Sequence, residues 1–184
     1  MSDPTPEMQV LRWIDDIVIG LNLCPFASGA RKRPGALRLH LANEVTDMHA
    51  ATSVVLGQAR ELLESPAQEL RTTLVIFPHS LQSFEDLLEV TAQVEDALSQ
   101  AGAEGILQVA TFHPQYIFAD APKDDPANYT NRSPYPIIHL LREQDVSDAV
   151  DSHIDADAIP RQNIESLRAL GMTRLLALWN SRTS

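Results

Sequence analysis

The amino-acid sequence predicts an α/β fold: a single-domain sandwich in which about four strands form a largely parallel or mixed sheet flanked by helices. Segments with helical periodicity alternate along the chain with short strand-like segments, and this alternation is typical of the class. The 184 residues suffice for one domain, and the chain has no linker long enough to divide it. A ferredoxin-like α+β sheet is the alternative fold.

The N-terminal segments carry clear local signals. Thr5 and Pro6 have the form of a helix start, and apolar residues recur at helical spacing as far as Asn22. Residues 23–35, which include a basic Gly/Pro segment, are predicted as a loop. In residues 36–42 leucines alternate with polar residues, so we expect a strand with one apolar face.

The remaining elements follow from the same two periodicities. Ser83, with Asp86 three residues later, is a start signal for an amphipathic helix that Gly102 closes. Right-handed crossovers predict that the first three strands run parallel. The elements predicted after residue 42 are a helix over 47–63, a strand over 72–77, a helix over 83–101, strands over 106–112 and 136–142, a short acidic helix over 144–150, and helices over 160–170 and 173–180.

Charge and cysteine content argue against several classes of function. With 25 acidic and 14 basic side chains the net charge is −11, so we expect neither nucleic acid nor a membrane surface as a partner. No secretory signal and no long apolar run is present, which favours a cytoplasmic protein. A single cysteine excludes an internal disulfide. The absence of a phosphate-cradling glycine loop argues against a nucleotide cofactor.

The segment 113–135, between the third and fourth strands, is the main candidate for a functional region. Loops of this length in compact domains are usually functional or disordered. This one holds four prolines and all three tyrosines of the chain, Tyr116, Tyr129 and Tyr135, which favour an ordered, packed loop. It leaves the carboxyl end of a strand, where open α/β sheets place their ligands. An ordered cap over a sheet edge is the alternative.

Histidines lie just after two of the predicted strands. His79 follows the second strand and His113 the third, so both would lie on one rim of the sheet if these strands are parallel neighbours. With Cys24 they could hold a transition metal. Cys24, His113 and His139 are also candidate catalytic groups for nucleophilic or acid–base chemistry. The chain has no metal-ligand spacing motif. We favour Cys24 as a buried small hydrophobe, because helix-to-loop junctions commonly bury a lone cysteine.

Three blocks of the sequence resemble a known family. They are Leu23-Cys24-Pro25-Phe26, Phe112-His113-Pro114 and the run from Asn131-Arg132-Ser133-Pro134-Tyr135-Pro136 to Glu143. They are similar to the signature blocks of a bacterial family known only as domain of unknown function 1415. The resemblance runs from about Val10 to Gly171 and leaves residues 173–184 outside. It implies a small bacterial protein without an assigned reaction, so it carries over no catalytic roles.

Arginines near these blocks suggest recognition of an anion. Arg132 lies in the tyrosine-rich loop, Arg142 ends the fourth strand, and Arg161 begins a helix. A guanidinium group binds carboxylate or phosphate with two parallel hydrogen bonds. Pairing with an internal Asp or Glu is the alternative for each arginine in so acidic a chain. The further candidates for ligand contacts are Asn131, Tyr116 and Tyr135.

These observations lead to three hypotheses of function. The first is a domain or enzyme that binds a small anionic metabolite in a pocket under the 113–135 loop, with His113 and His139 as acid–base groups. The second is a His/Cys transition-metal site. The third is an interaction module whose aromatic loop binds a protein partner or a second copy in a homodimer.

Overall fold

The structure, a computed structural model, describes residues 4–144 and 158–183. Most of the predicted acidic helix over 144–150 lies outside the described residues. The elements are α1 (Pro6–Trp13), the π-helix η1 (Ile14–Ile19), α2 (Pro25–Lys32), β1 (Leu37–Leu41), α3 (Met48–Glu64), β2 (Thr72–Ile76), α4 (Phe84–Gln100), β3 (Leu107–Phe112), the 3-10 helix η2 (Pro126–Thr130), β4 (Ile137–Arg142), α6 (Ile159–Leu170) and α7 (Met172–Thr183).

The four strands form one mixed sheet in the order β1-β2-β4-β3. β1 and β2 are parallel, whereas β4 is antiparallel to both of its neighbours, β2 and β3. The strands β1, β2 and β3 therefore run in the same direction, as predicted. The expectation that β2 and β3 could be neighbours is wrong, because β4 returns between them.

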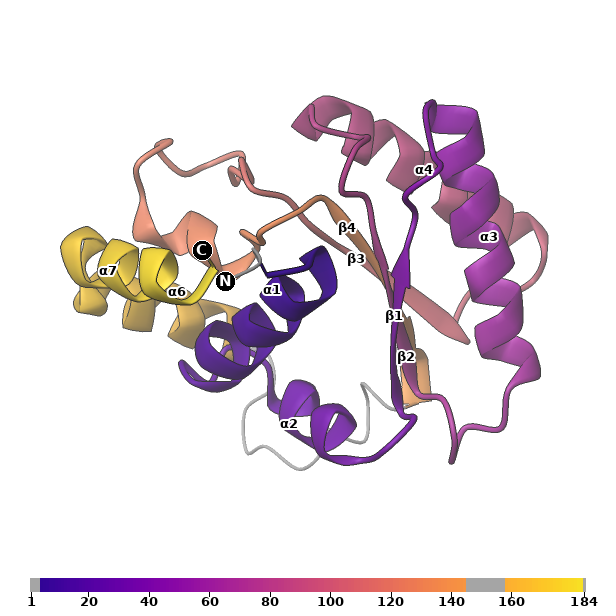
Figure 1. The fold of residues 1–184 in the computed structure, drawn as a ribbon, viewed down its shortest axis with the longest axis horizontal. Helices are drawn as coiled ribbons and strands as arrows, with labels where there is room; N and C mark the ends of the chain where they lie inside the picture. Colours follow the sequence, from indigo (N-terminus) through magenta and orange to yellow (C-terminus); the bar gives the residue numbers. More distant parts are fainter. Residues whose placement is uncertain (1–3, 145–157, 184) are drawn as a thin grey trace.

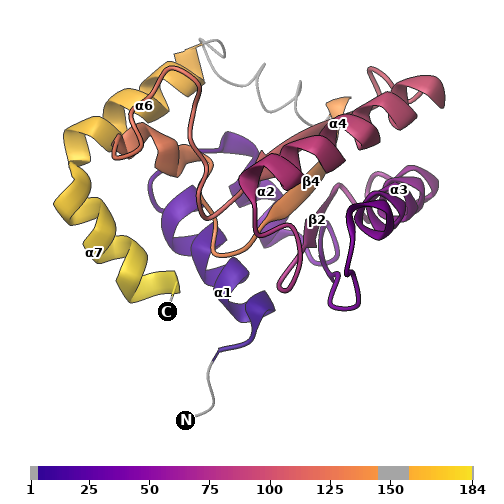
Figure 2. The same cartoon turned by 90° about the horizontal axis from the view of Figure 1, so that it is seen from above.

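Helices cover both faces of the sheet, so the protein is an open α/β domain with three layers (Figures 1 and 2). α3 and α4 pack on one face, and α1, η1, α2, α6 and α7 lie on the other (Figure 1). This confirms the predicted class. The ferredoxin-like alternative is not observed, since an α+β fold of that kind keeps its helices on one side of the sheet.

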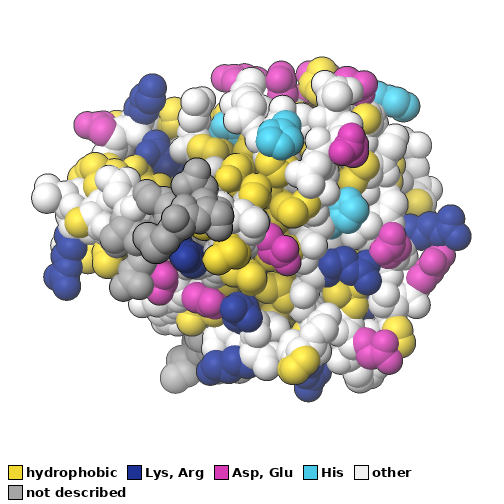
Figure 3. Space-filling model, in the orientation of Figure 1, with side chains coloured by type: hydrophobic (Ala, Val, Ile, Leu, Met, Phe, Trp, Pro, Cys, Tyr) yellow, Lys and Arg dark blue, Asp and Glu magenta, His cyan; other side chains and the backbone are white. Residues whose placement is uncertain are grey.

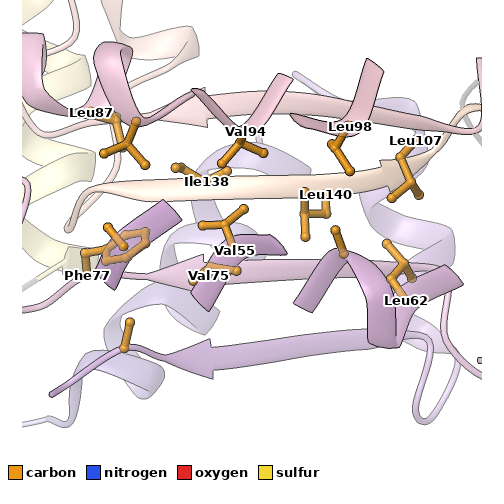
Figure 4. Close-up of a cluster of buried hydrophobic side chains, with 14 of the residues drawn as sticks. Val55, Leu62, Val75, Phe77, Leu87, Val94, Leu98, Leu107, Ile138 and Leu140 are labelled. Carbon is orange, nitrogen blue, oxygen red and sulfur yellow. The ribbon is translucent and has the colours of Figure 1, made fainter. Parts of the chain in front are cut away.

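The larger hydrophobic core fills the space between the sheet and the helices α3 and α4. Every second residue of a strand points to this face, and the helices contribute residues at helical spacing. Burying each such side chain contributes roughly 1.5–3 kcal/mol. Figure 4 labels the central members: Val55, Leu62, Val75, Phe77, Leu87, Val94, Leu98, Leu107, Ile138 and Leu140.

A second core lies on the opposite face, under α1, η1 and α7. Trp13, Ile17 and Leu175 are almost completely buried there. The leucines of β1 pack against this core, as the alternation over residues 36–42 predicts. On the other side of β1, Arg38 pairs with Glu61 of α3 at 2.6 Å. β1 therefore contributes side chains to both faces of the sheet, because successive side chains of a strand point in opposite directions.

The predicted loop over 23–35 is wrong, because most of it forms the helix α2. Pro25 occupies the first turn, where its missing N–H costs nothing. Phe26 and Ala30 follow one helical turn apart and are both buried against Leu141 of the sheet. The sequence signal for so short a helix is weak, and its stability comes from this tertiary packing.

The chain changes helix type before it reaches α2. Residues 14–19 form a π-helix, which continues α1 and ends near Gly20, whose N–H donates to the Asp15 carbonyl at 3.1 Å. Asn22 then adopts a left-handed conformation with φ +54°, and this reverses the chain into α2. Single π-turns are rare and occur often at functional sites.

The 113–135 loop is ordered and packed, as its composition predicts. Asn128 is fully buried and organises it: Oδ1 accepts from the Phe118 N–H, and Nδ2 donates to the Pro122 and Lys123 carbonyls. Arg168 of α6 holds the outer part of the loop through an ion pair with Asp125 at 2.7 Å. The loop is therefore a fixed part of the domain.

Candidate functional site

A cavity of about 500 Å³ lies between the sheet and the helices η1, α2 and α6. Its floor is the sheet face opposite to α3 and α4. Its lining is mainly apolar, and no charged side chain belongs to it among the described residues. The floor residues are Leu37, Thr72, Leu74, Gln108, Ala110, Phe112, His139 and Leu141. The walls include Trp13, Ile14, Val18, Leu23, Cys24, Phe26, Phe118, Thr130, Asn131 and Asn163.

Small side chains next to His139 create this space. In the sheet register His139 of β4 lies between Leu74 of β2 and Ala110 of β3, so the three share one face. The methyl group of Ala110 leaves the histidine ring uncovered on one side. Above it, α2 presents Ala27 and Ala30 to the cavity, and their small side chains leave the space between the helix and the sheet unfilled.

His139 is the central polar group of the cavity floor. Its Nε2 lies 2.6 Å from the Thr72 hydroxyl oxygen, and that oxygen lies 2.8 Å from the Leu140 carbonyl. A carbonyl oxygen can only accept, so the Thr72 hydroxyl donates to Leu140 and Nε2–H donates to Thr72. Burial lowers the pKa of His139 from its ordinary value to about 3. The ring is therefore neutral near pH 7.

Cys24 lines the same cavity at the N-terminus of α2. The residue is partly buried. Burial raises the pKa of its thiol above the ordinary value, and the opposing effect of the backbone N–H groups of Ala27 and Phe26 is smaller. The group is therefore a protonated thiol at neutral pH. The thiolate form that nucleophilic attack requires is disfavoured.

Two amides and a threonine complete the polar part of the walls. Asn131 donates from Nδ2 to the Thr111 carbonyl at 3.2 Å, and Asn163 donates from Nδ2 to the Leu23 carbonyl at 2.7 Å. The Thr130 hydroxyl donates to the Ala127 carbonyl at 2.8 Å. These contacts fix the side chains around the cavity before any ligand enters.

The structure places His113 on the other face of the sheet. It is 1% exposed and packs against Phe84 of α4. Nδ1 accepts from the Gln115 N–H at 3.0 Å, so Nε2 carries the proton and donates to the Leu81 carbonyl at 3.2 Å. Burial lowers the pKa of His113. With both nitrogens occupied, His113 holds the start of the loop and does not meet His139 or Cys24.

The three residues predicted to hold a metal do not come together. His113 is buried under α4, Cys24 lies across the sheet from it, and His79 is exposed. The reason is the strand order, which places β4 between the ends of β2 and β3. Among residues 4–144 and 158–183 no group of three or more His, Cys, Asp or Glu side chains has metal-binding geometry.

Arg132 holds the loop together and does not line the cavity. Its Nε donates to the Tyr116 carbonyl at 3.2 Å and a terminal nitrogen donates to the Lys123 carbonyl at 3.0 Å. The guanidinium lies 4.4 Å from the centre of the Tyr129 ring. Tyr116 itself packs between Phe84 and Phe118. The arginine partners are therefore backbone carbonyls and a ring, neither a ligand nor a carboxylate.

The other predicted binding residues also lie away from the cavity. Arg142 donates to the carbonyls of Leu62, Ser65 and Leu70, and thus covers the C-terminal end of α3. Arg161 is exposed on α6. Tyr135 donates from its hydroxyl to Gln9 of α1 at 2.7 Å, which fastens the loop to the first helix. Of the predicted site residues, the structure brings together Cys24, Asn131 and His139.

Sequence reasoning missed Thr72, Gln108 and Asn163. Alternation along a strand shows which residues share a face, but not which face is left hollow. The pairing of Thr72 with His139 depends on β4 lying beside β2, which no local pattern indicates. Asn163 lies one turn after Pro160 in a helix that was predicted, and only the packing of α6 directs it toward the cavity.

Charges of both signs are interspersed on the face of the molecule in Figure 3, with hydrophobic side chains between them. No helix in the described residues combines the length and the apolar composition that a membrane crossing requires.

Fold and site together define a small open α/β domain with a mainly apolar internal cavity. The chain belongs to the family described as "Protein of unknown function (DUF1415)", whose model matches residues 5–177. Searches of curated proteins and of solved structures each found no match.

Proposed function

We propose that this protein binds a small, mainly apolar molecule in the cavity between the sheet and the helices η1, α2 and α6. The observation that carries the proposal is a cavity of about 500 Å³ with an apolar lining and a few polar groups that converge around His139. Small-molecule sites in proteins have this size and composition. The neighbouring π-helix supports the same location.

The proposal keeps a cavity that the 113–135 loop helps to line, but it changes the expected ligand. The 113–135 loop contributes Phe118, Thr130 and Asn131 to the lining. None of the predicted arginines belongs to it, and an anion would enter a cavity whose described lining holds no positive charge. Burying an unpaired carboxylate costs many kcal/mol. An uncharged ligand therefore fits better than the anionic metabolite that the sequence suggests.

Binding of a small molecule is better supported than an interaction module or a Cys24–His139 catalytic pair. An interaction module would expose its aromatic side chains, but Tyr129 is buried and Tyr116, Phe118 and Tyr135 are partly buried. A Cys24–His139 catalytic pair would need a thiolate and an imidazolium. Burial acts against both charges, because it raises the pKa of Cys24 and lowers the pKa of His139.

Thermal unfolding with small naphthalene derivatives tests the proposal. A ligand at about 100 times its Kd adds about 2.7 kcal/mol, which raises the Tm of a chain this size by roughly 5–10 °C. Ala110→Phe fills the cavity beside His139 and should abolish the shift. Ala169→Phe, on the exposed side of α6, is the matched control and should retain it. Equal shifts in both variants, or none in the unmodified protein, would refute the site.

A further inference from the structure

The polar side chains that line the cavity have largely used their own hydrogen-bond donors. The hydroxyls of Thr72 and Thr130 both donate to backbone carbonyls, so each turns only lone pairs toward any further partner. Asn131 and Asn163 each donate one side-chain N–H to a backbone carbonyl. Each amide keeps its Oδ1 and a single N–H. Acceptors therefore outnumber donors among these four side chains, and Gln108, the remaining amide of the lining, belongs to an exposed residue.

The same logic fixes the tautomer of His139. Because the Thr72 hydroxyl proton points to the Leu140 carbonyl, the proton of the neutral imidazole must lie on Nε2. Nδ1 then carries a lone pair. No described residue donates a hydrogen bond to Nδ1, so this acceptor remains for a molecule in the cavity.

We infer that the ligand is an uncharged molecule with an O–H or N–H donor, such as an alcohol or phenol attached to an apolar body, and that this donor binds Nδ1 of His139. The inference deepens the proposed function and rests on it. The apolar body would fill the space over Ala110 and Phe112, which form the floor beside the histidine.

Charge and hydrogen bonding select against the other ligand classes. A carboxylate would bring its lone pairs against that of Nδ1 and would find no cation in the described lining. An ammonium group would find acceptors but no carboxylate to balance its charge. An ether of the same shape would leave the Nδ1 acceptor without a donor. Only an uncharged hydrogen-bond donor pairs with Nδ1 of His139 without burying a charge.

Three matched probes test this inference: 2-naphthol, 2-methoxynaphthalene and 2-naphthoate, titrated by calorimetry at pH 7. We expect 2-naphthol to bind about five- to tenfold more tightly than its methyl ether, which is the value of one net hydrogen bond. We expect 2-naphthoate to bind at least about a hundredfold more weakly than 2-naphthol. If none of the three binds, the proposed function fails. If the ether or the carboxylate binds as tightly as the naphthol, the cavity binds ligands but the inference fails.

Variants of Thr72 test the assignment of the tautomer. In Thr72→Val the side chain keeps its size but Nε2 loses its acceptor, so the preference for 2-naphthol over the ether should fall toward one. Thr72→Ser keeps the hydroxyl and should restore the preference. The imidazole ¹⁵N spectrum should show His139 protonated at Nε2 in the unmodified protein and in Thr72→Ser. Protonation at Nδ1 in the unmodified protein would overturn the inference even if a probe binds.

Discussion

His139 should make the protein less stable as the pH falls through the weakly acidic range. In the folded chain its pKa is lowered by burial to about 3, whereas in the unfolded chain it has the ordinary value of 6.5. Below pH 6.5 the unfolded chain therefore binds a proton that the native protein does not take up. The sign follows directly: the free energy of unfolding falls as pH drops, and the loss continues until pH approaches about 3.

The size of the effect can be worked out from the two pKa values. Linkage gives a loss of about 2 kcal/mol between pH 7.5 and pH 5 for this one group. Most carboxylates of an unfolded chain are still ionised at pH 5, so this window isolates the histidines. The lowered pKa of His113 acts in the same direction. The contribution of His139 must therefore be obtained as a difference between variants.

Urea unfolding at a series of pH values measures this difference. We expect His139→Gln to lose about 2 kcal/mol less than the unmodified protein between pH 7.5 and pH 5, whatever its absolute stability. If His139→Gln and the unmodified protein show the same pH dependence, His139 is not buried as a neutral ring and the reasoning is refuted.

Three further predictions concern Gly20, Arg142 and Cys24. Gly20→Ala should destabilise the protein by more than about 2 kcal/mol in urea unfolding, because a Cβ there would clash with the Asp16 carbonyl oxygen. Arg142→Met should cost about 2–4 kcal/mol in the same assay, since it leaves the carbonyls at the end of α3 without donors. Cys24 should react slowly with iodoacetamide at pH 7 and faster at higher pH, because burial raises the pKa of its thiol.

Each of these predictions has a control. Gly57→Ala, in the middle of α3 with open space around it, should raise stability by about 0.5–1 kcal/mol, so a similar gain for Gly20→Ala would contradict the predicted clash. Arg142→Lys keeps the charge without the planar fork and should recover only part of the loss. Labelling of Cys24 at pH 7 as rapid as that of a free thiol in solution would show a reactive group.

Several features of this protein were determined by local sequence alone. The leucines of residues 36–42 alternate and therefore face one core. Ser83 accepts a hydrogen bond from the Asp86 N–H and starts α4, and Gly102 ends it with φ +74°. The tyrosines and prolines of residues 113–135 favoured a packed loop. Each of these results depends on neighbours within a few residues, so a periodicity or a cap is enough to predict it.

The tertiary structure alone decided the position of β4 and everything that depends on it. Because β4 lies between β2 and β3, His79 and His113 are not neighbours and His139 is paired with Thr72. The roles of Arg132 and Arg142 also depend on carbonyl groups that only the folded chain brings within reach. Strand order and cavities result from packing summed over the whole chain. No single segment contains this information. Local patterns could therefore name His139 and Cys24 as candidates, but they could not show that the two residues share a cavity.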